Sequence, residues 1–166
     1  MKYINIFFIL GILLNTACTN FDTQKSPLVI RADSFYGALV ADTIIYDVII
    51  KNPNPEDAWT NECLKNFQHS TLMDSLFNLV YTRQATVYDF FSQEPLKVKE
   101  IKRMEKEEDF MRDNIGKIQF TEKWYFDAST QQLQKEVISM VLGYELKSDE
   151  GEVRGYKPIF KIQLNH

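Results

Sequence analysis

Two carboxylates beside an aromatic run are the residues whose types and spacing come nearest to a catalytic arrangement. Glu122 and Asp127 flank Trp124-Tyr125-Phe126. Glycosidases use such a pair, one carboxyl group as the acid and the other as base or nucleophile. Five residues apart on a strand, however, the two side chains point to opposite faces, and only a bulge would let both reach one substrate. The spacing therefore favours surface carboxylates that border a core strand.

Other catalytic constellations are not found in the sequence. The two histidines, His69 and His166, are far apart in the chain, so neither a metal-ligand spacing nor a Ser-His-Asp order can be recognised. The six glycines are scattered and form neither a P-loop nor a dinucleotide fingerprint. The sequence therefore predicts a protein that is not an enzyme and that uses no metal or other cofactor.

The first residues have the layout of an export signal. Met1-Lys2 precedes an apolar run, Tyr3 to Leu14, which is too short to cross a membrane, because a spanning helix needs about 20 apolar residues. Residues 1–17 are therefore predicted to be a signal peptide. The end of this segment, Thr16-Ala17-Cys18, resembles a bacterial lipoprotein signal, which implies that Cys18 is diacylated and anchors the protein in membrane lipid. The alternative is simple cleavage near Ala17 with a soluble product.

Size, charge and cysteine content restrict what remains. Removing 17 of 166 residues leaves 149, enough for one domain, which we place at 34–166 behind a flexible tether at 18–33. The formal net charge of −4 and the lack of a basic stripe argue against nucleic acid as a partner. If Cys18 carries a lipid, Cys63 is the one remaining thiol, and we expect it to be a small buried residue rather than a nucleophile.

The hydrophobic pattern predicts an α+β fold, a small antiparallel sheet packed by two to three helices and ending in a three-stranded meander. Ile118, Phe120, Trp124 and Phe126 have the period of a strand with one buried face. Pro158 cannot donate to a strand ladder, so the last strand is expected at an edge, or its Pro158 end at a bulge or unpaired position. The expected elements are strands at 35–50, 84–88, 118–126, 133–144 and 153–164 and helices at 56–67, 70–80 and 96–111, with a loop at 51–55.

Two helical segments carry patterns that bear on packing and binding. The stripe of Leu72, Met73, Leu76, Leu79 and Val80 recurs at three and four residues and is expected to face the core. In the segment 97–109 lysines and arginine dominate the first part and acidic residues the end. Such opposed blocks usually form a solvated face with weak pairs, and the alternative is a docking edge for a partner of complementary charge.

From about residue 42 to 164 the chain resembles the GldN/PorN family of gliding-motility and type IX secretion components of Bacteroidota. The similarity rests on Ser75–Val80 with Ala85–Asp89, on Glu122-Lys123-Trp124-Tyr125-Phe126-Asp127, and on Gly155-Tyr156-Lys157-Pro158-Ile159-Phe160. The chain looks like a shortened, lipoprotein-like variant of that pattern, since family members are typically longer and use a separate lipoprotein partner. Thr43–Lys51 also lacks their arginine-containing strand.

The resemblance implies a non-enzymatic subunit of the cell envelope, acting by protein–protein contact in the secretion and motility apparatus. With the Cys18 anchor, the expected location is the outer membrane, facing the periplasm. The alternative is a stand-alone lipid-anchored module that binds a glycan, a peptide or an inhibitor target. The expected contacts are the terminal sheet edge and nearby side chains, namely Trp124, Tyr125, Tyr156, Lys157 and Phe160, although strand alternation favours a core position for Trp124 and Phe160.

Overall fold

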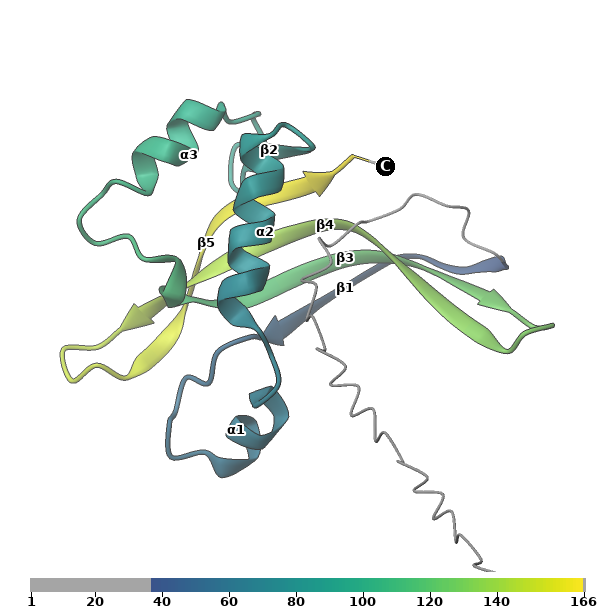
Figure 1. Ribbon diagram of the computed structural model, residues 1–166, viewed down its shortest axis with the longest axis horizontal. Helices are drawn as coiled ribbons and strands as arrows, with labels where there is room; N and C mark the ends of the chain where they lie inside the picture. The colour runs from purple at the N-terminus through teal and green to yellow at the C-terminus, as the bar shows by residue number, and fades with distance from the viewer. Residues whose placement is uncertain (1–36, 166) are drawn as a thin grey trace, which may run out of the picture.

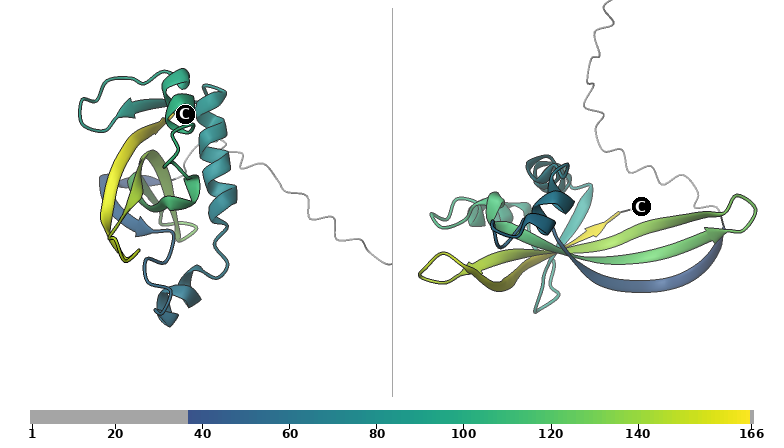
Figure 2. Two further views of the ribbon diagram at one scale, coloured as in Figure 1. Left: turned by 90° about the vertical axis from the view of Figure 1, so that its left-hand side faces the viewer. Right: turned by 90° about the horizontal axis from the view of Figure 1, so that it is seen from below.

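The computed structural model describes residues 37–165, which form a five-stranded antiparallel sheet in the order β1-β3-β4-β5-β2. The helices lie on one face of this curved sheet (Figure 1; Figure 2). The predicted α+β class with a C-terminal meander is confirmed. The predicted signal peptide, the tether and Cys18 lie outside the described residues. The elements are β1 (Ala38–Ile49), α1 (Ala58–Leu64), α2 (His69–Tyr81), β2 (Ala85–Asp89), α3 (Val98–Met104), a 3-10 helix η1 (Arg112–Asn114), β3 (Ile115–Asp127), β4 (Gln132–Lys147) and β5 (Val153–Leu164).

Two tight turns join the three strands of the meander. The carboxylate of Asp127, at the end of β3, accepts hydrogen bonds from the backbone and hydroxyl groups of Ser129 and Thr130. These bonds hold the pKa of Asp127 at about 2. Between β4 and β5, Gly151 adopts φ 87°, a left-handed conformation that glycine takes at little cost. Local turn chemistry therefore sets the pairing of β3 with β4 and of β4 with β5.

The last strand is an edge for only part of its length. β2 pairs with Phe160–Leu164, so the prediction of an edge is wrong for this part of β5. Among the described residues nothing pairs with the outer side of 153–159. Pro158 lies there, next to a bulge at which two steps along β4 match three along β5. The alternative position predicted for Pro158, at a bulge, is confirmed, because a residue without an N–H is tolerated there.

The core lies between α2 and the middle of the sheet. Met73, Leu76 and Val80 are buried as predicted, with Leu72 and Leu79 packed at the margin. Phe77, outside the predicted stripe, is also fully buried. Its ring has the Arg112 guanidinium above it, 4.2 Å from the centroid, and Arg112 also pairs with Asp74 and Glu105. The stacked and paired arginine closes the core where α2 meets η1.

The predicted helix at 96–111 is much shorter in the structure. α3 begins after Lys97 and ends at Met104, and Pro95 lies in a short bridge to Tyr88 rather than in a first helical turn. Carboxylates at a helix C-terminus oppose the helix dipole. The acidic residues 105 and 107–109 therefore disfavour continuation of the helix, and the chain turns toward η1 instead.

The short helix α1 contributes nothing to the core. Asp57 caps its start by accepting from the backbone of Trp59 and Thr60 at 3.0 and 3.2 Å, but none of its seven residues is buried. Cys63 is exposed, so the prediction of a buried thiol is wrong. The reason is the position of α1, which lies beyond the edge strand β1 and does not cover the sheet (Figure 1).

Candidate protein-binding surfaces

The predicted partner-binding residues belong to different surfaces. Successive side chains of a strand point to opposite faces, so Trp124 and Tyr125 lie on opposite sides of β3, and Tyr156 and Lys157 on opposite sides of β5. Trp124 shares the helix-bearing face. Tyr125 lies on the other face, where its hydroxyl donates to Glu136 Oε2 at 2.8 Å. The sheet therefore separates residues that the sequence places side by side.

Phe160 is not available to a partner because its side chain is fully buried. The ring packs edge-on against Phe77 of α2, with the two centroids 5.8 Å apart. Its choice as a partner-binding residue is therefore wrong, and the core position that strand alternation favoured is the one observed.

A buried carboxylate organises the helix-bearing face near the β3–β4 turn, a region that the helices leave uncovered (Figure 2). Glu122 Oε1 accepts a hydrogen bond from the Tyr46 hydroxyl, and Oε2 accepts one from Trp124 Nε1, both at 2.8 Å. Lys135 Nζ lies 3.8 Å from Oε2 and 4.5 Å from the Trp124 ring centroid. Burial and the hydrogen bond to Glu122 raise the pKa of Tyr46. This Glu122 cluster (Tyr46, Glu122, Trp124 and Lys135) ties β1, β3 and β4 together.

The strands on both sides of Glu122 are irregular. β1 shifts register between Ala41 and Ile44, and β4 carries an extra residue, Ile138, opposite the step from Thr121 to Glu122. Bulges change the direction of side chains and increase the local twist of a strand. The two irregularities therefore lie where the neighbouring strands adapt to a buried carboxylate. Asp127 lies at the turn with its own hydroxyl partners, and the two carboxylates flanking the aromatic run are in separate environments.

Tyr156 packs on the helix-free face against a second buried carboxylate, its cross-strand neighbour Glu145. The two meet over Gly116, where an added Cβ would lie 2.8 Å from Tyr156 Cε1 and 2.9 Å from Glu145 Oε1. Lys51 and Lys147 reach Glu145 Oε2 at 3.4 and 3.3 Å. Burial, followed by the charge of Glu145, raises the pKa of Tyr156. Tyr156 thus belongs to a packed ionic cluster.

Two of the predicted residues line hollows. Tyr156 lines a small one of about 120 Å³ on the helix-free face. Lys157 lines a larger cleft of about 440 Å³ beside the part of β5 that β2 does not cover. The other lining residues are mainly aromatic, aliphatic or acidic: Asp89, Phe91, Met104, Glu107, Asp109, Phe110, Tyr144, Pro158 and Ile159.

The opposite edge of the sheet is long and apolar. Among the described residues, none pairs with the outer side of β1, a strand of 12 residues. Leu39, Val40 and Ile45 are exposed by 49, 56 and 59%. Phe126 and Leu133, which face each other across β3 and β4, are also exposed. By strand alternation Leu39 and Ile45 lie on the helix-free face, and Phe126 and Leu133 on the helix-bearing face. We call these five residues, which flank the edge on both faces, the apolar edge. An edge of this kind offers unpaired backbone and apolar side chains to another chain.

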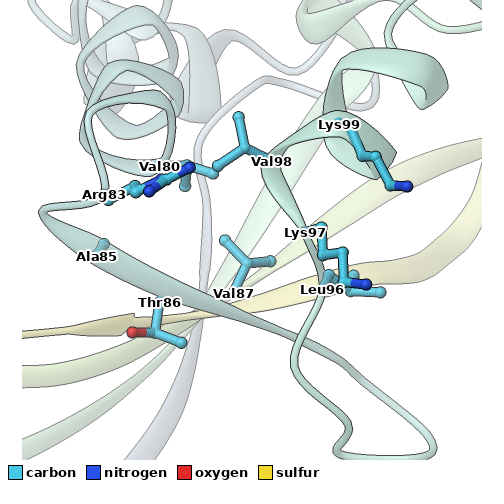
Figure 3. A pocket seen from close by; sticks show the side chains of 9 residues that line it. All are labelled: Val80, Arg83, Ala85, Thr86, Val87, Leu96, Lys97, Val98 and Lys99. Atoms are coloured by element: carbon cyan, nitrogen blue, oxygen red, sulfur yellow. The ribbon is translucent and has the colours of Figure 1, made fainter.

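A second hollow, of about 580 Å³, lies between β2 and the start of α3 (Figure 3). Its cations come from two directions: Arg83 follows α2 at one end, and Lys97 and Lys99 stand at the other. Arg83 has φ 59°, a left-handed conformation that is uncommon for a residue with a side chain. The remaining lining residues are Val80, Ala85, Thr86, Val87, Leu96 and Val98. We call this hollow the basic groove.

No group of three or more His, Cys, Asp or Glu residues within 37–165 is placed to hold a metal ion. In the same part of the chain, no helix is both long and apolar enough to span a membrane. No protein-family model matches the chain, and no curated protein matches it.

Sequence reasoning missed the Glu122 cluster and the basic groove for different reasons. Glu122 stands in phase with Ile118 and Phe120, and a carboxylate in a core phase beside a tryptophan is a usable signal of a buried polar cluster. The lysines of the groove lie in the charge block noticed at 97–109, but Arg83 joins them only through the packing of β2 and α3, which no local pattern shows.

Proposed function

We propose that this protein is a component of the bacterial cell envelope that works by protein–protein contact, with the apolar edge as its principal contact surface. The observation that supports this most directly is the exposed apolar character of β1, a long edge strand without an outer partner among the described residues. Strand addition to such an edge supplies backbone hydrogen bonds for affinity and side-chain contacts for specificity.

The proposed location in the cell comes from the sequence. The signal-like residues 1–17 and Cys18 support a lipid-anchored protein at the outer membrane, facing the periplasm. The resemblance to GldN/PorN proteins supports a place in the type IX secretion and gliding-motility apparatus. No catalytic step is part of the proposal.

Co-purification from detergent-solubilised envelopes tests the assembly. We expect the tagged protein to recover subunits of the secretion and motility apparatus, and Leu39→Lys with Ile45→Lys to abolish that recovery, because lysines on an edge strand oppose pairing. Trp59→Lys, at an exposed residue of α1, is the control for placing a lysine at an exposed apolar position and should leave recovery unchanged. Full recovery by the edge variant would contradict the role of β1.

Cell fractionation of Cys18→Ala tests the anchor. Each buried methylene of an acyl chain contributes about 0.8 kcal/mol to membrane binding, so the variant should move from the membrane to the soluble fraction. Membrane retention equal to that of the parent protein would contradict lipidation at Cys18.

The second candidate function is a stand-alone lipid-anchored binding module, favoured by the presence of two hollows, the basic groove and the cleft at Lys157. Their volumes fall within the range of about 300–1,000 Å³ that is usual for ligand sites. A detergent-solubilised monomer that recovers no apparatus subunits yet binds a ligand would favour this candidate over the first.

A further inference from the structure

We infer that the basic groove binds an extended acidic segment of a partner protein, in which carboxylates alternate with apolar side chains. The groove and the apolar edge lie at opposite edges of the sheet. The inference therefore goes beyond the proposed function by assigning a second contact surface and the chemistry of its partner.

Charge is the first argument. Arg83, Lys97 and Lys99 line the groove, and no carboxylate does. None of the three takes part in an ion pair within the described residues. Cations that line one hollow from different elements favour an anionic occupant. Nucleic acid fits poorly, because the chain as a whole is acidic and three cations neutralise few phosphates.

Strand pairing is the second argument, and it favours an extended peptide over a small anion. The segment after β2 returns along its outer side: Asp89 N–H donates to Glu94 O at 2.9 Å, and Leu96 N–H donates to Val87 O at 2.8 Å. This pairing ends because Lys97 is the N-cap of α3. No described strand continues beside Ala85 and Thr86, and the groove begins at that point. A peptide strand would therefore lie beside β2 at Ala85 and Thr86, where the chain itself provides no partner strand.

The lining of the groove indicates why apolar and acidic side chains should alternate in the bound peptide. Apolar side chains from α2, β2 and the segment before α3 form most of it, with the three cations around them. An extended segment places successive side chains on opposite sides. Apolar residues of the peptide would then contact the apolar part of the lining, while its carboxylates pair with the lysines and Arg83 that flank that part.

The test uses the full chain and a fluorescein-labelled octapeptide of alternating glutamate and valine, followed by fluorescence anisotropy. Lys97→Glu with Lys99→Glu should weaken binding by about tenfold or more, since attraction is replaced by repulsion. Arg103→Glu with Lys106→Glu is the control, because it makes the same charge change at exposed positions that do not line the groove. Equal weakening by both pairs would overturn the inference in favour of a general charge effect.

Two further measurements separate groove binding from simple attraction. Val98→Trp fills the groove with all three cations retained and should also weaken binding, while an unchanged thermal midpoint shows that the variant is folded. A glutamate–serine octapeptide should bind clearly less well than the glutamate–valine peptide. Normal binding by Val98→Trp, or equal binding of the two peptides, would overturn the inference. Peptide binding by the Leu39→Lys, Ile45→Lys variant should be unchanged, so failures of the two proposals are distinguishable.

Discussion

The two halves of the sheet bury their side chains in different ways. Beneath α2, Phe77, Leu142 and Phe160 exclude water by packing helix against sheet. Toward the β3–β4 turn no helix covers the same face (Figure 2), and the strands bury Glu122 among their own aromatic and lysine side chains instead. The first half is stabilised mainly by apolar area. In the second half, hydrogen bonds and a nearby lysine offset the cost of burying a charge.

This difference explains why we expect contact surfaces on the half of the sheet that no helix covers. Where a helix covers the sheet, strand alternation leaves little apolar surface exposed. Where it does not, the same alternation leaves Phe126 and Leu133 open to solvent, next to the unpaired side of β1. The Glu122 cluster links three strands of this uncovered half without a second layer.

The largest expected effect comes from breaking the covered half. Phe160→Ala should lower the free energy of unfolding by about 3–5 kcal/mol, because it leaves a cavity against Phe77. Urea denaturation followed by circular dichroism measures the change. Leu133→Ala, at an exposed residue of the uncovered half, is the control and should change stability by less than about 0.5 kcal/mol. Similar losses in both variants would contradict the contrast between the halves.

An intermediate effect is expected from the carboxylate of the uncovered half. Glu122→Ala leaves the Tyr46 hydroxyl and Trp124 Nε1 without their acceptor and should cost about 1–3 kcal/mol. In a double-mutant cycle, Glu122→Ala should cost less in a Tyr46→Phe background, since one of the two orphaned donors is then absent. Strictly additive losses would show that the hydrogen bond does not couple the two strands.

The smallest effect should be a dependence on acidity at the β3–β4 turn. The pKa of Asp127 is about 2 in the fold against an ordinary value of 3.8, so the ionised form is favoured in the folded state. Its stabilising contribution is therefore present above pH 3.8 and is lost as the pH falls through about 2. Asp127→Asn should flatten the loss of stability in that window, measured by urea denaturation at several pH values. An identical acid profile in the variant would contradict the role of the turn.

Local signals predicted most of the elements. Alternation and turn residues located the meander, β-branched composition located the first strand, and helical spacing located α2. Prediction failed where distant contacts decide the outcome. The five-residue β2 covers one part of β5 through long-range pairing. Phe77, by contrast, stands four residues after Met73 and three before Val80, so helical spacing does place it on the core face, although the predicted stripe left it out. Cys63 is exposed because α1 lies beyond the core, which its sequence does not reveal.

The candidate surfaces were less predictable than the fold. Of the residues expected at partner contacts within the described part of the chain, Lys157 lines a cleft and Phe160 is core. Trp124 and Tyr156 belong to packed polar clusters, and Tyr156 also lines a small hollow. For aromatic and polar residues near a strand end, the local sequence does not distinguish a buried position from an exposed one, because burial depends on which distant neighbours cover them.

The pairing of β2 with β5 also constrains the order of events as the chain is made. Its partners are 71 to 79 residues apart, from Asp89 with Phe160 to Ala85 with Leu164. β2 therefore cannot pair with β5 until residues 160–164 have been synthesised. Pairings between such distant segments slow folding. If residues 1–17 direct export as predicted, this delay would keep the sheet incomplete while the polypeptide is still threaded through the translocation channel.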